Sequence, residues 1–328
     1  QYFHGVSPFD LKTGKALEKK TKMTNTDVFG RKMLALGEEY SQLVAITAAM
    51  ASGTGLQKFA NVYPKRFFDV GIAEQHAVTF AAGLAREGMI PVVAVYSSFL
   101  QRAYDQILHD VCLQNLHVVF AIDRSGLVGE DGATHQGIFD AAYLSNIPNM
   151  TVIAPKNRYE LTKALEFAME YQGPVALKYS KGAAFYGLRE QLEPIECGKS
   201  EILFKGSKVA LIAVGNMVEE ACKVYEALKE KGNEITLVNA RFIKPLDETM
   251  LKNLAKEHEV IFTLEEQLFQ GGYGQAVSSF YMRNHMNRIR VENIAIEDTF
   301  VEHGAVAALR KRLGLDAESV LQKIEQYL

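Results

Sequence analysis

Two polar stretches of this sequence contain residue types that can move protons or bind anions. Glu74 follows an apolar run that ends at Val70, and His135 lies in a polar loop, 123–137, that contains four glycines. A positioned carboxylate or imidazole can act as an acid or a base, and glycines let backbone N–H groups approach an anion. The residues alone leave ordinary interpretations open, because Glu74 could simply offset a helix dipole and His135 could make only a structural hydrogen bond.

A third stretch, from Tyr96 to Arg102, is predicted to be a strand end that turns into a helix. Tyr96 and Phe99 could equally be core aromatics, and Arg102 could be a solvated charge. The glycine-rich loop lacks the Lys-Ser/Thr ending of a P-loop and gives little support for a nucleotide site. All three stretches follow predicted strands, and open α/β sheets bind ligands beyond the carboxyl ends of their strands.

The elements that must position these residues are alternating strands and helices. Buried strands are expected at 43–48, 67–70, 91–96, 118–122, 152–154, 175–179, 209–214, 235–238, 260–264 and 294–296. Helices are expected from an N-cap at Thr26 to about Glu39, from Ala73 to a stop at Gly88, and over 218–229, 275–281 and 305–313. The alternation predicts α/β structure with two doubly wound, mostly parallel sheets.

Length and punctuation predict two domains. The chain has 328 residues, about twice a usual domain length, and glycines and prolines interrupt all periodicity between about Lys181 and Ser207. The predicted order is a connector over 1–22, a first domain over 23–185, a linker over 186–200 and a second domain over 201–328.

Composition excludes several function classes. The net charge is −3 without a basic run, which argues against nucleic acid as a partner. No apolar stretch reaches the roughly 18 residues that a membrane span needs. Three scattered cysteines favour a reducing, cytoplasmic setting over a disulfide framework. The histidines show no metal-ligand spacing, so no metal ligand is predicted within the chain.

Longer segments resemble a known family. These are "DVGIAEQHAV" from Asp69, "YSSFLQRAYDQILHDV" from Tyr96 and "AIDRSGLVGEDGATHQG" from Ala121, with weaker similarity in "GVSPFDLKTGK" from Gly5 and "EEQLFQGGYG" from Glu265. They resemble the 1-deoxy-D-xylulose-5-phosphate synthase family, thiamine diphosphate enzymes of the transketolase group. The resemblance implies a pyrimidine-binding domain followed by a transketolase C-terminal domain, and a homodimer.

The family's first domain, whose Gly-Asp-Gly…Asn signature binds Mg²⁺ and the diphosphate of thiamine diphosphate, has no match here. Because the sequence also starts at Gln1 rather than Met, we expect a truncated, proteolysed or split enzyme. The Mg²⁺ ligands are expected in that missing domain, supplied in cis or in trans. The chain alone is expected to bind the cofactor poorly and to be inactive.

The resemblance also implies roles for individual residues. The family condenses pyruvate with D-glyceraldehyde 3-phosphate, releasing CO₂, to make 1-deoxy-D-xylulose 5-phosphate for isoprenoid, thiamine and pyridoxal biosynthesis. Glu74 would hydrogen-bond the cofactor's aminopyrimidine, and Glu74 and His135 are the implied catalytic residues. The implied cofactor contacts are Glu74, Phe99, Arg102 and Ile72. The implied substrate contacts are Tyr96, Arg102, Arg124, Asp131, His135 and Lys181.

One position departs from the family pattern, and two other functions stay open. Lys181 stands where the family usually has an arginine that grips the acceptor's phosphate, and lysine lacks the bidentate geometry of arginine. The first alternative is the β-subunit of a 2-oxo acid dehydrogenase E1 component, which has the same two domains. The second is a non-catalytic module that acts in assembly or regulation.

Overall fold

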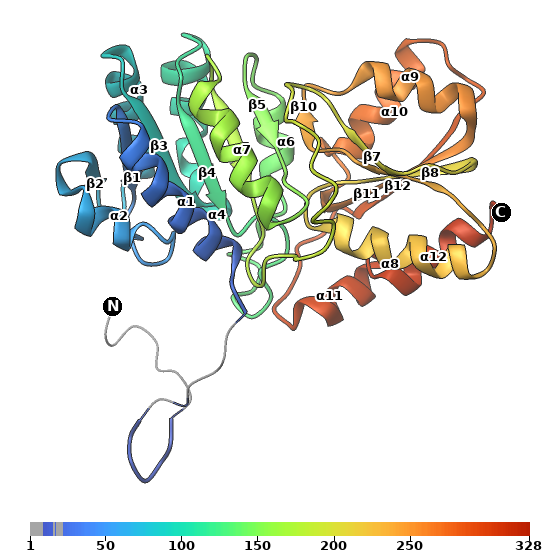
Figure 1. Cartoon of the computed structure of the whole chain (residues 1–328), viewed down its shortest axis with the longest axis horizontal. Coiled ribbons are helices and arrows are strands. Elements are labelled where there is room, and N and C mark those ends of the chain that lie inside the picture. The colour runs from blue at the N-terminus through green and yellow to red at the C-terminus, as the bar shows by residue number, and fades with distance from the viewer. Residues whose placement is uncertain (1–8, 16, 18–21) are drawn as a thin grey trace.

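The computed structural model describes residues 9–15, 17 and 22–328. Its helices and strands, which begin at Asn25, form two α/β domains lying side by side (Figure 1). The strands are β1 Leu43–Thr47, β2 Phe67–Asp69, β3 Ile90–Tyr96, β4 Val119–Asp123, β5 Thr151–Ile153, β6 Val175–Lys178, β7 Glu201–Phe204, β8 Lys208–Ala213, β9 Thr236–Asn239, β10 Phe242–Lys244, β11 His258–Leu268 and β12 Arg290–Ile296. The α-helices are α1 Asn25–Glu39, α2 Gln57–Val62, α3 Glu74–Arg86, α4 Ser97–Leu100, α5 Tyr104–Gln106, α6 Asp140–Ser145, α7 Arg158–Glu170, α8 Met217–Glu230, α9 Glu248–Glu257, α10 Tyr273–Arg283, α11 Val306–Leu313 and α12 Ala317–Glu325. Short 3₁₀ turns η1 and η2 cover Pro64–Arg66 and Gln101–Ala103, and a π-helical segment, η3, covers Ile107–Cys112.

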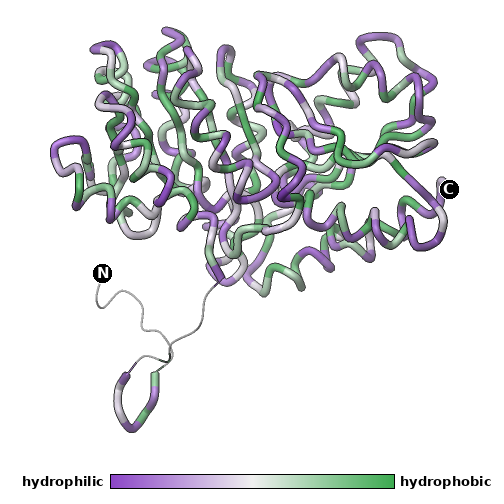
Figure 2. The backbone as a smooth tube through the Cα atoms, in the orientation of Figure 1, coloured by the Kyte–Doolittle hydropathy of each residue, from purple (hydrophilic) through white to green (hydrophobic). Residues whose placement is uncertain are grey.

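Two mostly parallel sheets organise the chain, which confirms the predicted fold class. The first sheet has seven strands in the order β10-β5-β6-β4-β3-β1-β2, and the second has five in the order β12-β11-β8-β9-β7. Hydrophobic residues concentrate along the strands of both sheets (Figure 2). In β1, Leu43 and Ala45 pack with α1 and α7, whereas Val44 and Ile46 pack with α3, because alternate side chains face opposite sides of a sheet.

One expectation about the strands was wrong, and two strands, β7 and β10, were not predicted. The strand predicted at 67–70 is not buried: β2 is the edge of the first sheet, pairs only with β1, and leaves Phe68 37% exposed. Of the two strands that were not predicted, β10 lies within the predicted second domain, 201–328, but pairs antiparallel with β5 in the first sheet. Its position depends on this long-range pairing and not on a local periodic pattern.

The N-cap of α1 was also predicted at the wrong residue. Thr24, not Thr26, caps the helix, through a reciprocal capping box with Asp27. The hydroxyl of Thr26 instead donates to Asp123 Oδ2 at the end of β4, 2.7 Å away. The predicted connector, 1–22, lies mostly outside the described residues, and the predicted linker, 186–200, contains no helix or strand.

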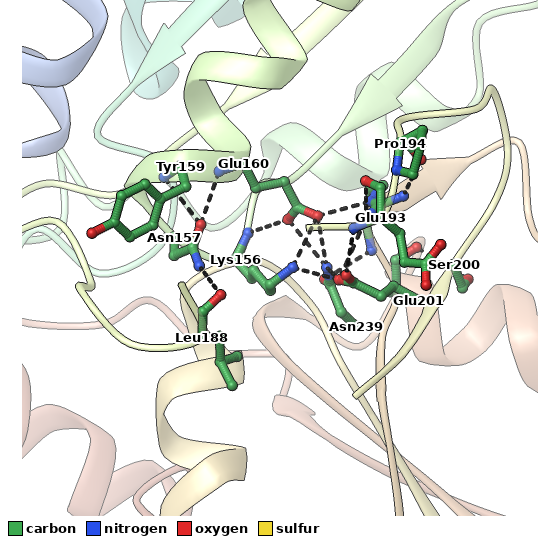
Figure 3. Close-up of polar contacts among 12 residues, drawn as sticks. Lys156, Asn157, Tyr159, Glu160, Leu188, Glu193, Pro194, Ser200, Glu201 and Asn239 are labelled. Carbon is green, nitrogen blue, oxygen red and sulfur yellow. Dashed lines mark hydrogen bonds and ion pairs between the residues drawn. The ribbon is translucent and has the colours of Figure 1, made fainter. Parts of the chain in front are cut away.

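A buried charge cluster joins the two domains. Glu160, in the first turn of α7, accepts hydrogen bonds from the backbone N–H of Lys156 and from Arg241 Nε, both at 2.7 Å. Glu201, on β7, accepts a hydrogen bond from Lys156 Nζ. Asn239 Nδ2 donates to the carboxylates of both Glu160 and Glu201 (Figure 3). All five side chains are at most 3% exposed. Two acids and two cations are thus neutralised where the domains meet.

Candidate active site

The loop before α3 is built to hold Glu74 at a sheet edge. Asp69, the last residue of β2, accepts hydrogen bonds at one oxygen from the N–H of Gly71 and of Ala49, at 3.0 and 2.7 Å. Gly71 has φ +72°, a conformation that costs a residue with a Cβ energy. The chain thereby turns sharply from the strand into the helix, and Glu74 becomes the first helical residue.

The carboxylate of Glu74 is buried and incompletely satisfied. The residue is 3% exposed, and its Oε2 has no hydrogen-bond partner in the described part of the chain. Arg102 Nη1 lies 3.7 Å from the same oxygen, but the arginine side chain is 62% exposed. Ile72, two residues earlier, is 77% exposed. A buried carboxylate oxygen without a partner carries a desolvation cost, and a ligand that donates a hydrogen bond would relieve it.

Aromatic rings connect the end of β3 to the glycine-rich loop. Tyr96 stacks on Phe99 with centroids 5.6 Å apart, and Phe99 meets His135 edge-on at 5.3 Å. Arg124 lies over the outer part of this group, with its Cζ 3.8 Å from the Tyr96 ring centroid. Gly53 makes room for the phenol, since a Cβ there would lie 2.3 Å from the Tyr96 hydroxyl oxygen. Burial raises the pKa of Tyr96, so the phenol stays protonated near neutral pH.

The charged candidates form one cluster around Asp131. Its Oδ2 accepts from Lys181 Nζ at 2.7 Å and from Arg124 Nη1 at 3.3 Å. Partial burial would raise the pKa of Asp131, but Lys181, Arg124 and His135 outweigh that effect and lower it. Arg124 itself has φ +62°, which is uncommon outside glycine. These ion pairs place two cations, Arg124 and Lys181, beside the aromatic group, with the carboxylate of Asp131 between them.

The structure thus brings eight of the nine candidate residues into two linked groups. Tyr96, Phe99, Arg124, Asp131, His135 and Lys181 are connected by ring contacts and ion pairs. Glu74 and Arg102 form the other group, and α4 and η2 join Arg102 to Phe99 along the chain. Ile72 belongs to neither group, although it lies in the loop directly before Glu74.

Asp123, beneath this site, was not predicted. It ends β4, is fully buried, and has one carboxylate oxygen without a partner among the described residues. Burial raises the pKa of Asp123 to about 7, although the Thr26 hydrogen bond opposes the rise. Its neighbour Arg124 was identified through the family resemblance, whereas an acid at the end of a hydrophobic strand gave no pattern to recognise.

A cavity of about 290 Å³ lies between the domains, and Tyr96, Phe99 and His135 are not among its described lining residues. Lys181 is the only one of the nine candidates among its described lining residues, which also include Lys178, Glu266 and Arg310. These charges are already paired, as Lys178 bonds Asp140 and Arg310 bonds Glu266. We therefore place the candidate chemistry at Glu74 and the aromatic group.

Two classes of feature are absent from residues 9–15, 17 and 22–328. No group of three or more His, Cys, Asp or Glu side chains is arranged to hold a metal ion. No helix in these ranges has the length and apolarity for a membrane crossing.

Two protein-family models match this chain, one over each of its two domains. The family model for the transketolase pyrimidine binding domain matches residues 21–185, and the model for the transketolase C-terminal domain matches residues 198–320. The first match takes in Glu74 and all the other candidate residues, and the second takes in β7 to α11 and part of α12.

Curated relatives agree with the sequence resemblance. The chain is 54% identical over 322 residues to 1-deoxy-D-xylulose-5-phosphate synthase of Lachnoclostridium phytofermentans, covering 98% of this chain and 52% of the relative. It is 50% identical over 324 residues to the synthase of Desulforudis audaxviator, covering 98% and 51%. The predicted resemblance is confirmed, and the chain spans about half the length of these relatives.

One solved structure aligns with both domains of this chain over almost its whole length. A split gene transketolase, described as an inactive beta4 tetramer, superposes with a TM-score of 0.83 at 28% identity, over 94% of this chain and 98% of that one. Transketolase from Campylobacter jejuni shows the same fold with a TM-score of 0.75 at 18% identity, over 94% of this chain and 47% of its own. The chain therefore belongs to the transketolase family, with a pyrimidine-binding domain followed by a transketolase C-terminal domain.

Proposed function

We propose that this chain is the pyrimidine-binding and C-terminal part of a thiamine diphosphate-dependent 1-deoxy-D-xylulose-5-phosphate synthase. The enzyme would join pyruvate to D-glyceraldehyde 3-phosphate with loss of CO₂. The observation that carries the proposal is Glu74, whose buried Oε2 lacks a hydrogen-bond partner among the described residues. The names of the relatives, at about 50% identity, support the substrate assignment.

The residues around Glu74 fit the pyrimidine end of the cofactor. The unpartnered oxygen would accept a hydrogen bond from the ring, and the protein's low-dielectric surroundings would strengthen that bond. Phe99 offers an aromatic face, Ile72 an apolar contact, and Arg102 a charge near the carboxylate. When bound, thiamine diphosphate supplies the carbon nucleophile that the reaction needs. The protein's share is to hold the ring and to set the position of its proton.

The substrates would bind on the other side of Phe99. Arg124 and Lys181 present two cations, which suit the carboxylate of pyruvate and the phosphate of the acceptor. Asp131 would hold both cations in place, and Tyr96 would support Arg124 through its ring. His135 Nδ1 lies 2.9 Å from Thr134 Oγ1, which would direct Nε2 toward the substrate for proton exchange.

We also propose that a diphosphate-binding domain, in cis or in trans, supplies the Mg²⁺ ligands, and that the assembled enzyme is a cytoplasmic homodimer. A structure of the same extent carries the description of an inactive tetramer, which supports the expectation that this chain alone is inactive. The names of the relatives favour the synthase over a 2-oxo acid dehydrogenase β-subunit.

Reconstitution tests the proposal. The chain is mixed, or fused, with the diphosphate-binding domain of the Lachnoclostridium phytofermentans relative and supplied with Mg²⁺, thiamine diphosphate and both substrates. We expect 1-deoxy-D-xylulose 5-phosphate and an equal amount of CO₂ from the mixture, and neither from the chain alone. A folded assembly that binds the cofactor but releases CO₂ only with a lipoyl acceptor would refute the synthase assignment.

A further inference from the structure

The end of β11, in the second domain, contacts the loop that carries Asp131 and His135. Three consecutive residues make these contacts: Glu266, Gln267 and Leu268. The loop is closed at its base, where Gly126 and Gly137 exchange backbone hydrogen bonds of 2.7 and 2.8 Å. The second domain therefore holds a loop of the first domain at the point where the loop begins and ends.

Glu266 is the centre of this contact. It is 3% exposed, and its Oε2 accepts from the backbone N–H of Leu127 at 3.0 Å and from Asn216 Nδ2 at 2.8 Å. Its Oε1 accepts from Arg310 Nε at 2.6 Å. Gly126 lets the carboxylate approach, because a Cβ there would lie 2.3 Å from Oε2. One carboxylate thus joins the loop to the N-terminal end of α8 and to α11.

Gln267 and Leu268 hold the returning side of the loop. Gln267 Nε2 donates to the carbonyl oxygen of Gly137 at 2.9 Å, and its Oε1 accepts from the N–H of Ala141 at 3.2 Å. The N–H of Leu268 donates to the carbonyl oxygen of Ile138 at 3.1 Å. Both sides of the loop are therefore fixed to a strand that contains none of the nine candidate residues.

We propose that Glu266 is a positioning residue for the substrate site: through Leu127 it fixes the loop of Asp131 and His135, so that the second domain completes a site formed by the first. This role in substrate binding rests on the proposed function. The fixing of the loop does not, because it follows from the contacts alone.

An amide in place of the carboxylate cannot reproduce these contacts in either orientation. With its nitrogen at the Oε2 position, Glu266→Gln would face two donors, Leu127 N–H and Asn216 Nδ2. With its nitrogen at the Oε1 position, it would face the Arg310 guanidinium. Opposed donors in a buried place cannot both be satisfied, so the loop base is expected to open locally.

Hydrogen–deuterium exchange on the full chain tests the fixing of the loop. We expect Glu266→Gln to speed exchange of the amides from 126 to 137 by about tenfold, with the strands of both sheets unchanged. Glu318→Gln is the matched control, because it removes the same charge from a side chain that is 64% exposed. If Glu266→Gln does not fold, Gln267→Met removes the bond to Gly137 and is measured instead. Exchange equal to the control in a folded variant would overturn the proposal.

Steady-state kinetics of the reconstituted enzyme test the substrate role. We expect the KM for the phosphorylated acceptor to rise about tenfold in Glu266→Gln, with cofactor affinity unchanged and a smaller effect on kcat. A merely structural defect would instead lower the active fraction and leave KM unchanged, and that result would overturn the substrate role. If the wild-type assembly lacks synthase activity, the proposed function fails, and the exchange measurement alone decides whether Glu266 fixes the loop.

Discussion

Substitution of Glu160 by glutamine tests how much the buried charge cluster between the domains contributes to the free energy of unfolding. The carboxylate accepts from Lys156 N–H, Arg241 Nε and Asn239 Nδ2 and lies 3.4 Å from Lys156 Nζ. Burial alone would raise the pKa of Glu160, but Lys156 and Arg241 outweigh it and lower the pKa. The glutamine variant leaves two buried cations with one carboxylate, Glu201. Breaking a buried pair in this way costs about 3–5 kcal/mol.

That cost is a large share of an ordinary unfolding free energy of about 5–15 kcal/mol. It corresponds to a fall in Tm on the order of 10 °C. Since the chain contains no tryptophan, far-UV circular dichroism and calorimetry are the suitable probes. Glu318→Gln, which breaks the exposed pair with Lys311, is the control and is expected to cost less than about 1 kcal/mol.

The double variant Glu160→Gln/Lys156→Met restores neutrality, and we expect it to recover part of the lost stability. If Glu160→Gln lowers Tm no more than the exposed control does, the cluster does not stabilise the domain pair and the reasoning is wrong.

Two further predictions concern the site itself. Because Asp123 binds its proton more tightly when folded, with a pKa near 7 against 3.8, its contribution to the unfolding free energy should fall as the pH rises from about 4 to about 7. The buried acid Glu265, whose pKa is raised to about 6, contributes a change of the same sign. Asp123→Asn should remove most of this dependence of the unfolding free energy on pH, as measured by urea unfolding. A pH profile equal to that of the wild type would exclude Asp123 as its source. Lys181→Arg should lower the acceptor KM modestly in the reconstituted enzyme, since a guanidinium binds phosphate through two nitrogens; an unchanged or higher KM would contradict this.

The fold was largely predictable because its parallel strands are buried on both faces. Ten of the twelve strands were predicted, and all of these except the edge strand β2 appear in the sequence as runs that contain valine or isoleucine. The other two, β7 and β10, were not predicted, and β10 is placed by its contact with β5 of the other domain. Thr24 caps α1 through Asp27, whereas the hydroxyl of Thr26 bonds Asp123, 97 residues along the chain.

Part of the site was predictable because its residues stand near strand ends. Tyr96 ends β3, Arg124 directly follows β4, and Glu74 comes five residues after the end of β2, so α/β geometry places them beyond the carboxyl ends of strands. Glu266 gave no such signal, since its partners lie 139 residues away on the loop and 50 and 44 residues away at Asn216 and Arg310. Contacts of that separation belong to the packing of the domains, and no local pattern records them.

The most direct test of the central claim measures the effect of Glu74 on the bound cofactor. In the reconstituted enzyme, exchange of the cofactor's C2 proton with deuterated solvent is followed by NMR for the wild type, Glu74→Gln and the exposed control Glu318→Gln. We predict that Glu74→Gln slows the exchange by about 10²–10⁴-fold, while cofactor affinity changes far less. Exchange at the wild-type rate in a Glu74→Gln enzyme that still binds the cofactor would contradict the account.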